Sequence, residues 1–450
     1  MPAEAAGASG AARSAEASVP VAAGPAPDPS GASPASPDAG LAHVAAVSFL
    51  AARATPSGGF WITLAGGAAL ARAGERLGAR RGYGASIAAM LQSVAMIGPA
   101  RLGVPLTQAL SAPLLGRMEA DGRGTLPQVL VCALIRTVQN ILGAAFFIGI
   151  VTGLEAYAAS YDVLFTRVLP LPSGSQAALI ATAAGLLAWS AFGSTIQVLV
   201  YRRGLARWDR EADLGDVASG PARRPIPSAA EPPPVPGADA RPHRFDPRAV
   251  TLATAVAFGL LLTSTAWPLV AAVAAWLAVA SVVAARADRD VLPAGLILAA
   301  ILAASGFLFT VIGGLGLDLA LRRGARAGLL VLVATWLRAA AGSEGLREVG
   351  RRSLRRLRAL PAVNEAQHAL DELGATPRLA AAGRALFASL RPVRKRPLPV
   401  ADAVLGWVRL EADRFRAAGP TQAARVHLRP RDVALVALSA IPVAALLAGA

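Results

Sequence analysis

The sequence has very few of the residues on which catalytic and metal sites usually depend. Cys132 is the single cysteine, which excludes disulfides within the chain and a cysteine-based zinc site. The four histidines lie far apart and show no metal-ligand spacing. Lys395 is the only lysine, and no glycine-rich loop ends in Gly-Lys-Ser/Thr, so the chain has no recognisable ATPase loop. No candidate span holds paired carboxylates or clustered histidines, so the sequence predicts neither an enzyme nor a bound metal or cofactor.

Charged and aromatic residues are also scarce. Only 16% of the residues are charged, against about 25% in soluble domains. Aromatic residues make up 5%, too few for platforms on which nucleic-acid bases stack. The chain is 54% apolar with a mean hydropathy of +0.50, which indicates an integral membrane protein. The net charge of +16, almost all from arginine, then fits loops retained on the cytoplasmic side, and nucleic acid is not a predicted partner.

Several apolar runs are long enough to cross a bilayer. Two lie in the first half of the chain, and four more are followed by a last apolar run at the C-terminal end. The predicted spans are 128–154, 177–201, 249–266, 267–285, 291–315 and about 327–341, with the last run at 433–450. We therefore expect an all-α, polytopic integral membrane protein with long amphipathic cytoplasmic helices, placed as a multi-pass protein in the inner or plasma membrane.

The composition divides the chain into four parts. Residues 1–40 are Ala, Pro, Ser and Gly, which predicts a disordered tail without the basic start and apolar centre of a secretory signal. Residues 41–202 form an N-terminal membrane block of unassigned role, and in 41–116 its short, Pro-broken apolar runs favour re-entrant, interfacial or buried helices. A Pro-rich linker follows at 203–242, before the second block at 243–450.

Charge sets the expected topology. Residues 344–432 hold 18 Arg and Lys against 9 Asp and Glu, which predicts that this region is cytoplasmic. The linker begins with the basic "YRRGLARWDR" and belongs on the same side. Four predicted spans lie between these two cytoplasmic segments. An even number of spans is required, because it returns the chain to the same side of the membrane. "LRRGAR" (321–326) would then fall outside, unless it belongs to an amphipathic piece that runs into the fourth span.

The cytoplasmic region 342–431 contains a basic amphipathic pattern. "LREVGRRSLRRLRAL" places Leu346, Leu354 and Leu357 near one helix face and arginines on the others. A helix of this kind either docks in a partner's groove or lies on an anionic membrane surface. Both interpretations are open at this point.

Polar residues inside the predicted spans are candidates for function. Arg136, Gln139 and Asn140 fall on one helix face by their three- and four-residue spacing. In the alternative interpretation Arg136 extends to the interface, and the two amides bond a neighbouring helix. Gln108, in the Pro-flanked "VPLTQALSAP", is either a group in a broken-helix binding site or part of a short buried helix.

The stretch "RPHRFDPR" precedes the first apolar run of the second block. Asp246 followed by Pro247 is typical of an N-cap and a first-turn proline, because the carboxylate accepts from free backbone N–H groups. Arg244 and Arg248 can reach lipid phosphates and anchor the helix end.

The same stretch carries a resemblance. "HRFDPRAVTL" resembles the N-terminal signature of the transmembrane T component of energy-coupling-factor (ECF) transporters, with His243, Asp246, Pro247 and Arg248 at the matching positions. The segment 342–361 is similar to the part that follows that family's membrane helices. "RLEADRFRAAGP" and "HLRPRDVALVALSAIP" resemble its C-terminal end, where a coupling motif precedes the last helix. The resemblance covers about 243–450.

The resemblance implies a membrane scaffold whose cytoplasmic helices lie against two ABC-type ATPase subunits. It also implies a separate substrate-binding membrane subunit that moves a vitamin or metal ion inward, and it makes Arg414 and Arg416 the candidates for coupling to the ATPases. One interpretation of the N-terminal block is a fused substrate-binding subunit. The competing hypothesis is a non-transport membrane protein whose basic cytoplasmic domain binds membrane lipid or other proteins.

Overall fold

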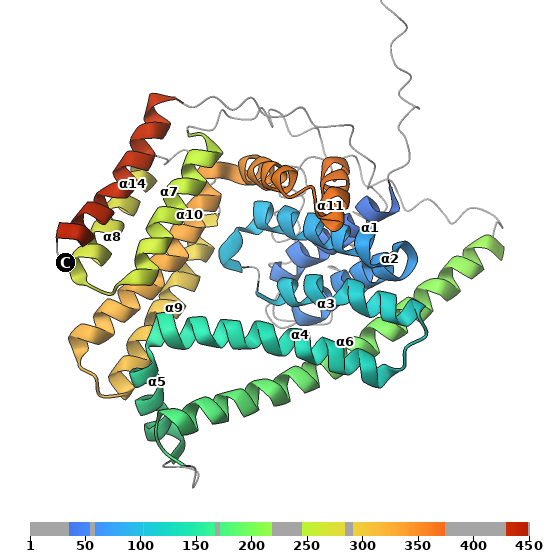
Figure 1. Ribbon diagram of the computed structural model, residues 1–450, viewed down its shortest axis with the longest axis horizontal. Helices are drawn as coiled ribbons and strands as arrows, with labels where there is room; N and C mark the ends of the chain where they lie inside the picture. The colour runs from blue at the N-terminus through green and yellow to red at the C-terminus, as the bar shows by residue number, and fades with distance from the viewer. Residues whose placement is uncertain are drawn as a thin grey trace, which may run out of the picture. The chain divides into compact units, whose positions relative to one another are not determined.

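The computed structural model describes residues 36–54, 59–101, 103–166, 172–217, 245–283, 291–373 and 429–448. Within these ranges the elements are all helical (Figure 1). The α-helices are α1 (Pro37–Ala51), α2 (Gly59–Ile97), α3 (Gly103–Ala120), α4 (Thr125–Phe146), α5 (Leu154–Tyr161), α6 (Ser175–Val217), α7 (Pro247–Thr263), α8 (Trp267–Val283), α9 (Leu292–Ile312), α10 (Leu317–Arg356), α11 (Pro361–Glu372) and α14 (Pro430–Ala448). A π-helical turn, Phe147–Thr152, extends α4.

Four helical segments are long and apolar enough to cross a membrane, and the chain is an all-α, polytopic membrane protein. They are Thr125–Thr152, Ser175–Ala206, Leu292–Ile312 and Leu317–Arg356. The spans predicted at 128–154, 177–201 and 291–315 match the first three segments closely. The fourth is longer than the predicted 327–341, because 317–326 and 342–356 belong to the same helix. The segment 321–326 therefore runs into the fourth span, which is the alternative that the sequence left open.

Two predicted spans are shorter than expected. α7 and α8 contain 17 residues each, where the sequence predicted 249–266 and 267–285. At 1.5 Å per residue each is about 26 Å long, slightly less than the ~30 Å hydrocarbon core. α7 ends at Thr263 because the residues around 264–266 form an extended turn, in which Ser264 accepts a hydrogen bond from the backbone N–H of Ala266. α8 is described to Val283, and residues 284–290 lie outside the described residues.

Two predicted boundaries were wrong. The tail predicted at 1–40 lies outside the described residues except for its last part, where Pro37 already begins α1 and Asp38 is buried against Arg81. The linker predicted from residue 203 also begins too early, because α6 continues to Val217. The remainder of the linker, up to residue 244, lies outside the described residues.

The first three helices are packed closely together, as expected for buried helices and not for separate spans. Among the short apolar runs of 41–116, residues 60–71 and 86–97 both fall within α2, which changes direction at Gly78. Helix α2 packs on α1 and α3 through small residues: a Cβ on Gly74 would meet the Pro113 carbonyl, and one on Gly116 would meet the Ala71 carbonyl. Small residues of this kind let helix backbones approach closely.

Helix α10 bends where a glycine is required. Gly342 has φ 68° and ψ 170°, a conformation that is essentially restricted to glycine. Each side of the kink contacts helices of both blocks: Arg338, before it, donates to the Met96 carbonyl of α2, and Gly345, after it, packs against Pro247 of α7. In the second half, Leu346 is buried in the core shared with α7 and α8, and Leu354 is buried in the core shared with α1, α2 and α11.

This packing shows that the chain itself covers part of the amphipathic pattern for which the sequence left open a partner's groove or a membrane surface. Leu346 and Leu354 are buried within the chain itself, and only Leu357, at 53% exposure, remains open. Arg347 and Arg351 are buried too: Arg347 donates to the Leu370 carbonyl at 2.5 Å, and Arg351 pairs with Glu348 at 2.8 Å. The sequence pattern showed one apolar face but could not show that two helices of the same chain flank this segment.

We predict that Gly342→Ala destabilises the protein by about 1–3 kcal/mol, because alanine does not tolerate this backbone conformation. Thermal unfolding of the full chain in mild detergent would measure it. Gly143→Ala is the matched control, since Gly143 lies within α4 with open space around its Cβ position. Equal melting temperatures for the two variants would contradict the constraint at the kink.

Candidate functional sites at the α7–α14 junction and between α3, α4 and α6

The start of α7 has the predicted capping geometry. The Asp246 side chain accepts a hydrogen bond from the backbone N–H of Arg248 at 2.8 Å, and Pro247 occupies the first turn. The N-cap prediction is therefore confirmed. Asp246 is buried, whereas Arg248 is exposed, so the arginine projects from the helix start.

One carboxylate joins this helix start to the last described helix. Asp432, only 1% exposed, accepts from the backbone N–H of Asp246 at 2.8 Å through Oδ1, and from the backbone N–H of Arg429 at 2.8 Å through Oδ2. The partners Asp246 and Asp432 are 186 residues apart in the sequence. The contact brings together "FDPR" (245–248) and "RPRD" (429–432), the described parts of the two segments on which the family resemblance rests at its ends.

The junction presents arginines at its surface. Arg248, Arg429 and Arg431 are exposed and lie within three positions of Asp246 or Asp432. None of the three forms an ion pair with an acidic residue in the described ranges, and the two buried aspartates are engaged by backbone N–H groups. His243, Arg414 and Arg416 lie outside the described residues.

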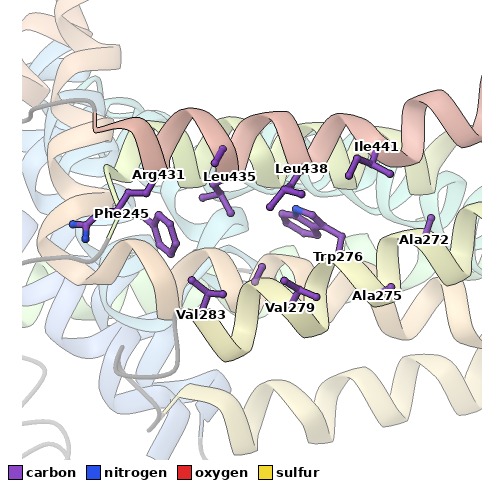
Figure 2. Close-up of a pocket in the computed structure, with 12 residues that line it drawn as sticks. Phe245, Ala272, Ala275, Trp276, Val279, Val283, Arg431, Leu435, Leu438 and Ile441 are labelled. Carbon is purple, nitrogen blue, oxygen red and sulfur yellow. The ribbon is translucent and has the colours of Figure 1, made fainter.

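An apolar groove of about 410 Å³ begins at this junction and runs between α8 and α14 (Figure 2). Arg431 is its one charged residue. The lining residues are Phe245, Ala272, Ala275, Trp276, Val279, Ala280, Val283, Arg431, Ala434, Leu435, Leu438 and Ile441. Trp276 forms the floor with support from Trp336, whose ring centroid lies 5.2 Å away in an edge-to-face arrangement. No sequence pattern indicated the groove, because its existence depends on how far α14 lies from α8.

A second polar feature lies between α3, α4 and α6, which pack against one another (Figure 1). Large apolar side chains on α4 and α6, such as Leu134 and Phe192, are exposed on the outer faces, as expected where lipid is the solvent. The inner faces carry polar side chains at three- and four-residue spacing, which we call the polar stripe. Its members are Gln108, Ser111, Gln128, Cys132, Arg136, Asn140, Ser190, Ser194, Gln197 and Tyr201.

Hydrogen bonds connect the polar stripe across the three helices. Arg136 donates to Gln197 Oε1 at 2.6 Å, and Gln197 Nε2 donates to Ser111 Oγ at 2.7 Å. Tyr201 donates to Gln108 Oε1. Such bonds hold helices together in an apolar solvent, where an unpaired polar group is costly.

The stripe ends in an ion pair near the α3–α4 turn. Glu119 accepts from Arg202 Nε at 3.2 Å and from Gln128 Nε2 at 2.5 Å. Arg202 also bonds Thr125. A charged layer therefore closes one end of a stripe that is otherwise neutral apart from Arg136.

The three predicted intramembrane residues do not share one environment. Asn140 donates to Ser190 Oγ at 3.0 Å, as predicted for an amide that bonds a neighbouring helix, whereas Gln139 turns toward the Gly103 carbonyl at 3.4 Å. Whether Arg136 extends to the interface stays a prediction; its side chain is only 6% exposed and faces α6. Packing against Gly193 explains this, because a residue without a side chain leaves room for the guanidinium.

Sequence reasoning missed most of the stripe. Gln128, Cys132, Arg136 and Asn140 recur every four residues, and this regular spacing was the available signal. Gln108 is completely buried, and its Nε2 has no hydrogen-bond partner among the residues that the structure describes.

Comparison with known proteins adds no relative. No protein-family model matches the chain, and neither the curated proteins nor the solved structures searched contain a match.

We predict that Asp432→Ala destabilises the protein by about 2–4 kcal/mol, because the backbone N–H groups of Asp246 and Arg429 both lose their acceptor. Chemical denaturation of the detergent-solubilised chain would measure the change. Asp121→Ala is the control: Asp121 forms an exposed pair with Arg117 at 2.9 Å, and its removal should cost less than ~1 kcal/mol. An equal loss of unfolding free energy in the two variants would show that the Asp432 hydrogen bonds stabilise the protein no more than an exposed ion pair does.

We predict that Arg136→Leu remains folded within about 2 kcal/mol of the natural chain. Removing a cation from a membrane span stabilises the folded state by roughly 2.5–3.5 kcal/mol. Leaving the Gln197 amide oxygen without its donor destabilises it by roughly 1–3 kcal/mol. Thermal unfolding would test this, with Arg136→Leu/Gln197→Leu expected to be more stable than the single variant. A large loss in the double variant would instead make Arg136 a structural residue.

Proposed function

We propose that the chain is the membrane scaffold and coupling subunit of an ECF-type ABC importer for a vitamin or metal ion, in the inner or plasma membrane. The observation that carries the proposal is the hydrogen bond from Asp246 N–H to the Asp432 carboxylate. It joins the two ends of the region that resembles the T component, so the two motif segments form one structural unit. Its partners are ABC-type ATPases and a separate substrate-binding membrane subunit.

The turn between α10 and α11 supplies a surface for an ATPase. Here Arg355, Arg356 and Arg358 are exposed beside Leu357 and Leu360, which are more than half exposed. We call these five residues the basic tip. The planar guanidinium group of arginine forms paired hydrogen bonds with a carboxylate in a partner's groove. The two leucines supply apolar contact area.

The basic tip is connected to both membrane blocks. It directly follows α10, whose Arg338 donates from Nε to the Met96 carbonyl of α2 at 3.1 Å. On the other side it leads into α11, where Glu365 pairs with Arg80 of α2 at 2.9 Å. A displacement of the tip by an ATPase would therefore be transmitted to α2 and to the membrane half of α10. Arg414 and Arg416 remain the coupling candidates that the resemblance implies.

The competing function is a non-transport membrane protein that interacts through its basic cytoplasmic region. One observation favours it: Leu346, Leu354, Arg347 and Arg351 are buried within the chain, which leaves a smaller surface for ATPases than the sequence indicated.

The test is co-purification of the tagged full-length chain, expressed together with ECF-type ATPases and extracted in mild detergent. We expect a stoichiometric ATPase pair, lost in Arg355→Glu/Arg356→Glu because the introduced carboxylates repel an acidic groove. Arg123→Glu/Arg203→Glu is the matched control, since both arginines are exposed but far from the basic tip in the sequence. Recovery of the natural chain alone would refute the scaffold function and favour the interaction protein.

A further inference from the structure

The groove between α8 and α14 offers space for a ligand beside the arginines of the junction. Its volume of about 410 Å³ lies within the usual range of ligand pockets. Apart from Arg431, its lining residues are alanine, valine, leucine, isoleucine, phenylalanine and tryptophan (Figure 2). Val279, Leu438 and Ile441 are exposed along its rim, so the groove opens to the surroundings of the helices.

The length of the groove matches one leaflet of a bilayer. On α14 its lining residues recur at three- and four-residue spacing from Arg431 to Ile441, along one face of the helix. Ten residues of α-helix extend about 15 Å. This is half of the ~30 Å hydrocarbon core, the depth reached by one acyl chain.

The charge lies at one end only. Arg431 is in the first turn of α14, and Arg429 and Arg248 flank the same junction. The nearby carboxylates of Asp246 and Asp432 are buried and accept backbone hydrogen bonds, and they form no ion pair with the outward arginines in the described part of the chain. With three arginines against two aspartates, the junction keeps a net positive charge. Arginine binds phosphate oxygens through paired N–H groups, and each basic residue near a membrane surface strengthens binding of anionic lipid.

These observations specify an amphiphile with an anionic head and an apolar chain. We propose that the groove is a binding site for one anionic phospholipid. Its phosphate contacts Arg431, with Arg248 and Arg429 alongside, and one acyl chain lies between α8 and α14. Because the neighbouring segment 344–432 is strongly basic, the site belongs to the cytoplasmic leaflet. The inference is independent of the transport function, since it uses only the groove and its arginines.

The experiment is native mass spectrometry of the full-length chain in detergent, titrated with phosphatidylglycerol or with phosphatidylcholine carrying the same acyl chains. We expect one phosphatidylglycerol to bind at least about tenfold more tightly than phosphatidylcholine, and roughly fivefold of this preference to be lost for each arginine removed. Arg248→Gln/Arg431→Gln tests the head site, and Arg123→Gln/Arg203→Gln is its control. Inorganic phosphate alone should leave the melting temperature unchanged, because it cannot occupy the apolar groove.

A second pair of variants tests the chain site. Ala275→Trp fills the groove from α8, whereas Ala278→Trp adds the same bulk at an exposed α8 position outside the lining. We expect the first to abolish the tight phosphatidylglycerol site and the second to retain it, with both variants eluting as the natural chain does in size-exclusion chromatography. Equal affinity for the two lipids, stabilisation by inorganic phosphate alone, or unchanged lipid binding in Ala275→Trp would overturn the proposal. So would a protein partner occupying the groove in the purified chain.

Discussion

The requirement that polar groups find hydrogen-bond partners away from lipid is the constraint on which the rest of the structure depends. It explains why polar side chains on α4 and α6 face α3 and one another, while leucines and aromatic residues face outward. It also explains why arginines of α10 are directed at backbone carbonyls. Arg326 donates to the Ile150 carbonyl in the π-helical turn after α4, where the wider backbone spacing leaves a carbonyl available.

The same constraint joins the parts of the chain that the sequence presents as separate blocks. Arg338 in α10 donates to the Met96 carbonyl at the end of α2, and Ser160 of α5 donates to the Phe309 carbonyl of α9 at 2.5 Å. Glu372 at the end of α11 accepts from the backbone N–H of Ser36 at 2.8 Å and from its hydroxyl at 2.5 Å. In each of these bonds a side chain from one part of the chain pairs with a polar group near a helix end in another part.

The local features of the fold could be predicted from the sequence, because they depend on neighbouring residues. Run length located the spanning segments Thr125–Thr152 and Leu292–Ile312, and the pair Asp246–Pro247 identified the start of α7. The long-range features could not be predicted. Leu346 and Leu354 lie on one apolar face of the segment after Gly342. The sequence of such a face is the same whether it packs on a membrane, on another protein or on the chain's own helices, so only the structure identifies what it packs on. The sequence identified Arg136 as a candidate. It did not identify the partner Gln197, because that residue lies on another helix, 61 positions away.

The carboxylate of Asp432 has a consequence for the order in which the protein is made. The backbone N–H of Asp246 emerges from the ribosome 186 residues before its acceptor. At about 5–20 residues per second this is a delay of roughly 10–40 s. For most of this interval α7 and α8 have been made and α14 has not, so the side of Trp276 and Val279 that later lines the groove is uncovered. A lipid can therefore occupy that position before α14 arrives, and the last helix then closes over a molecule already in place.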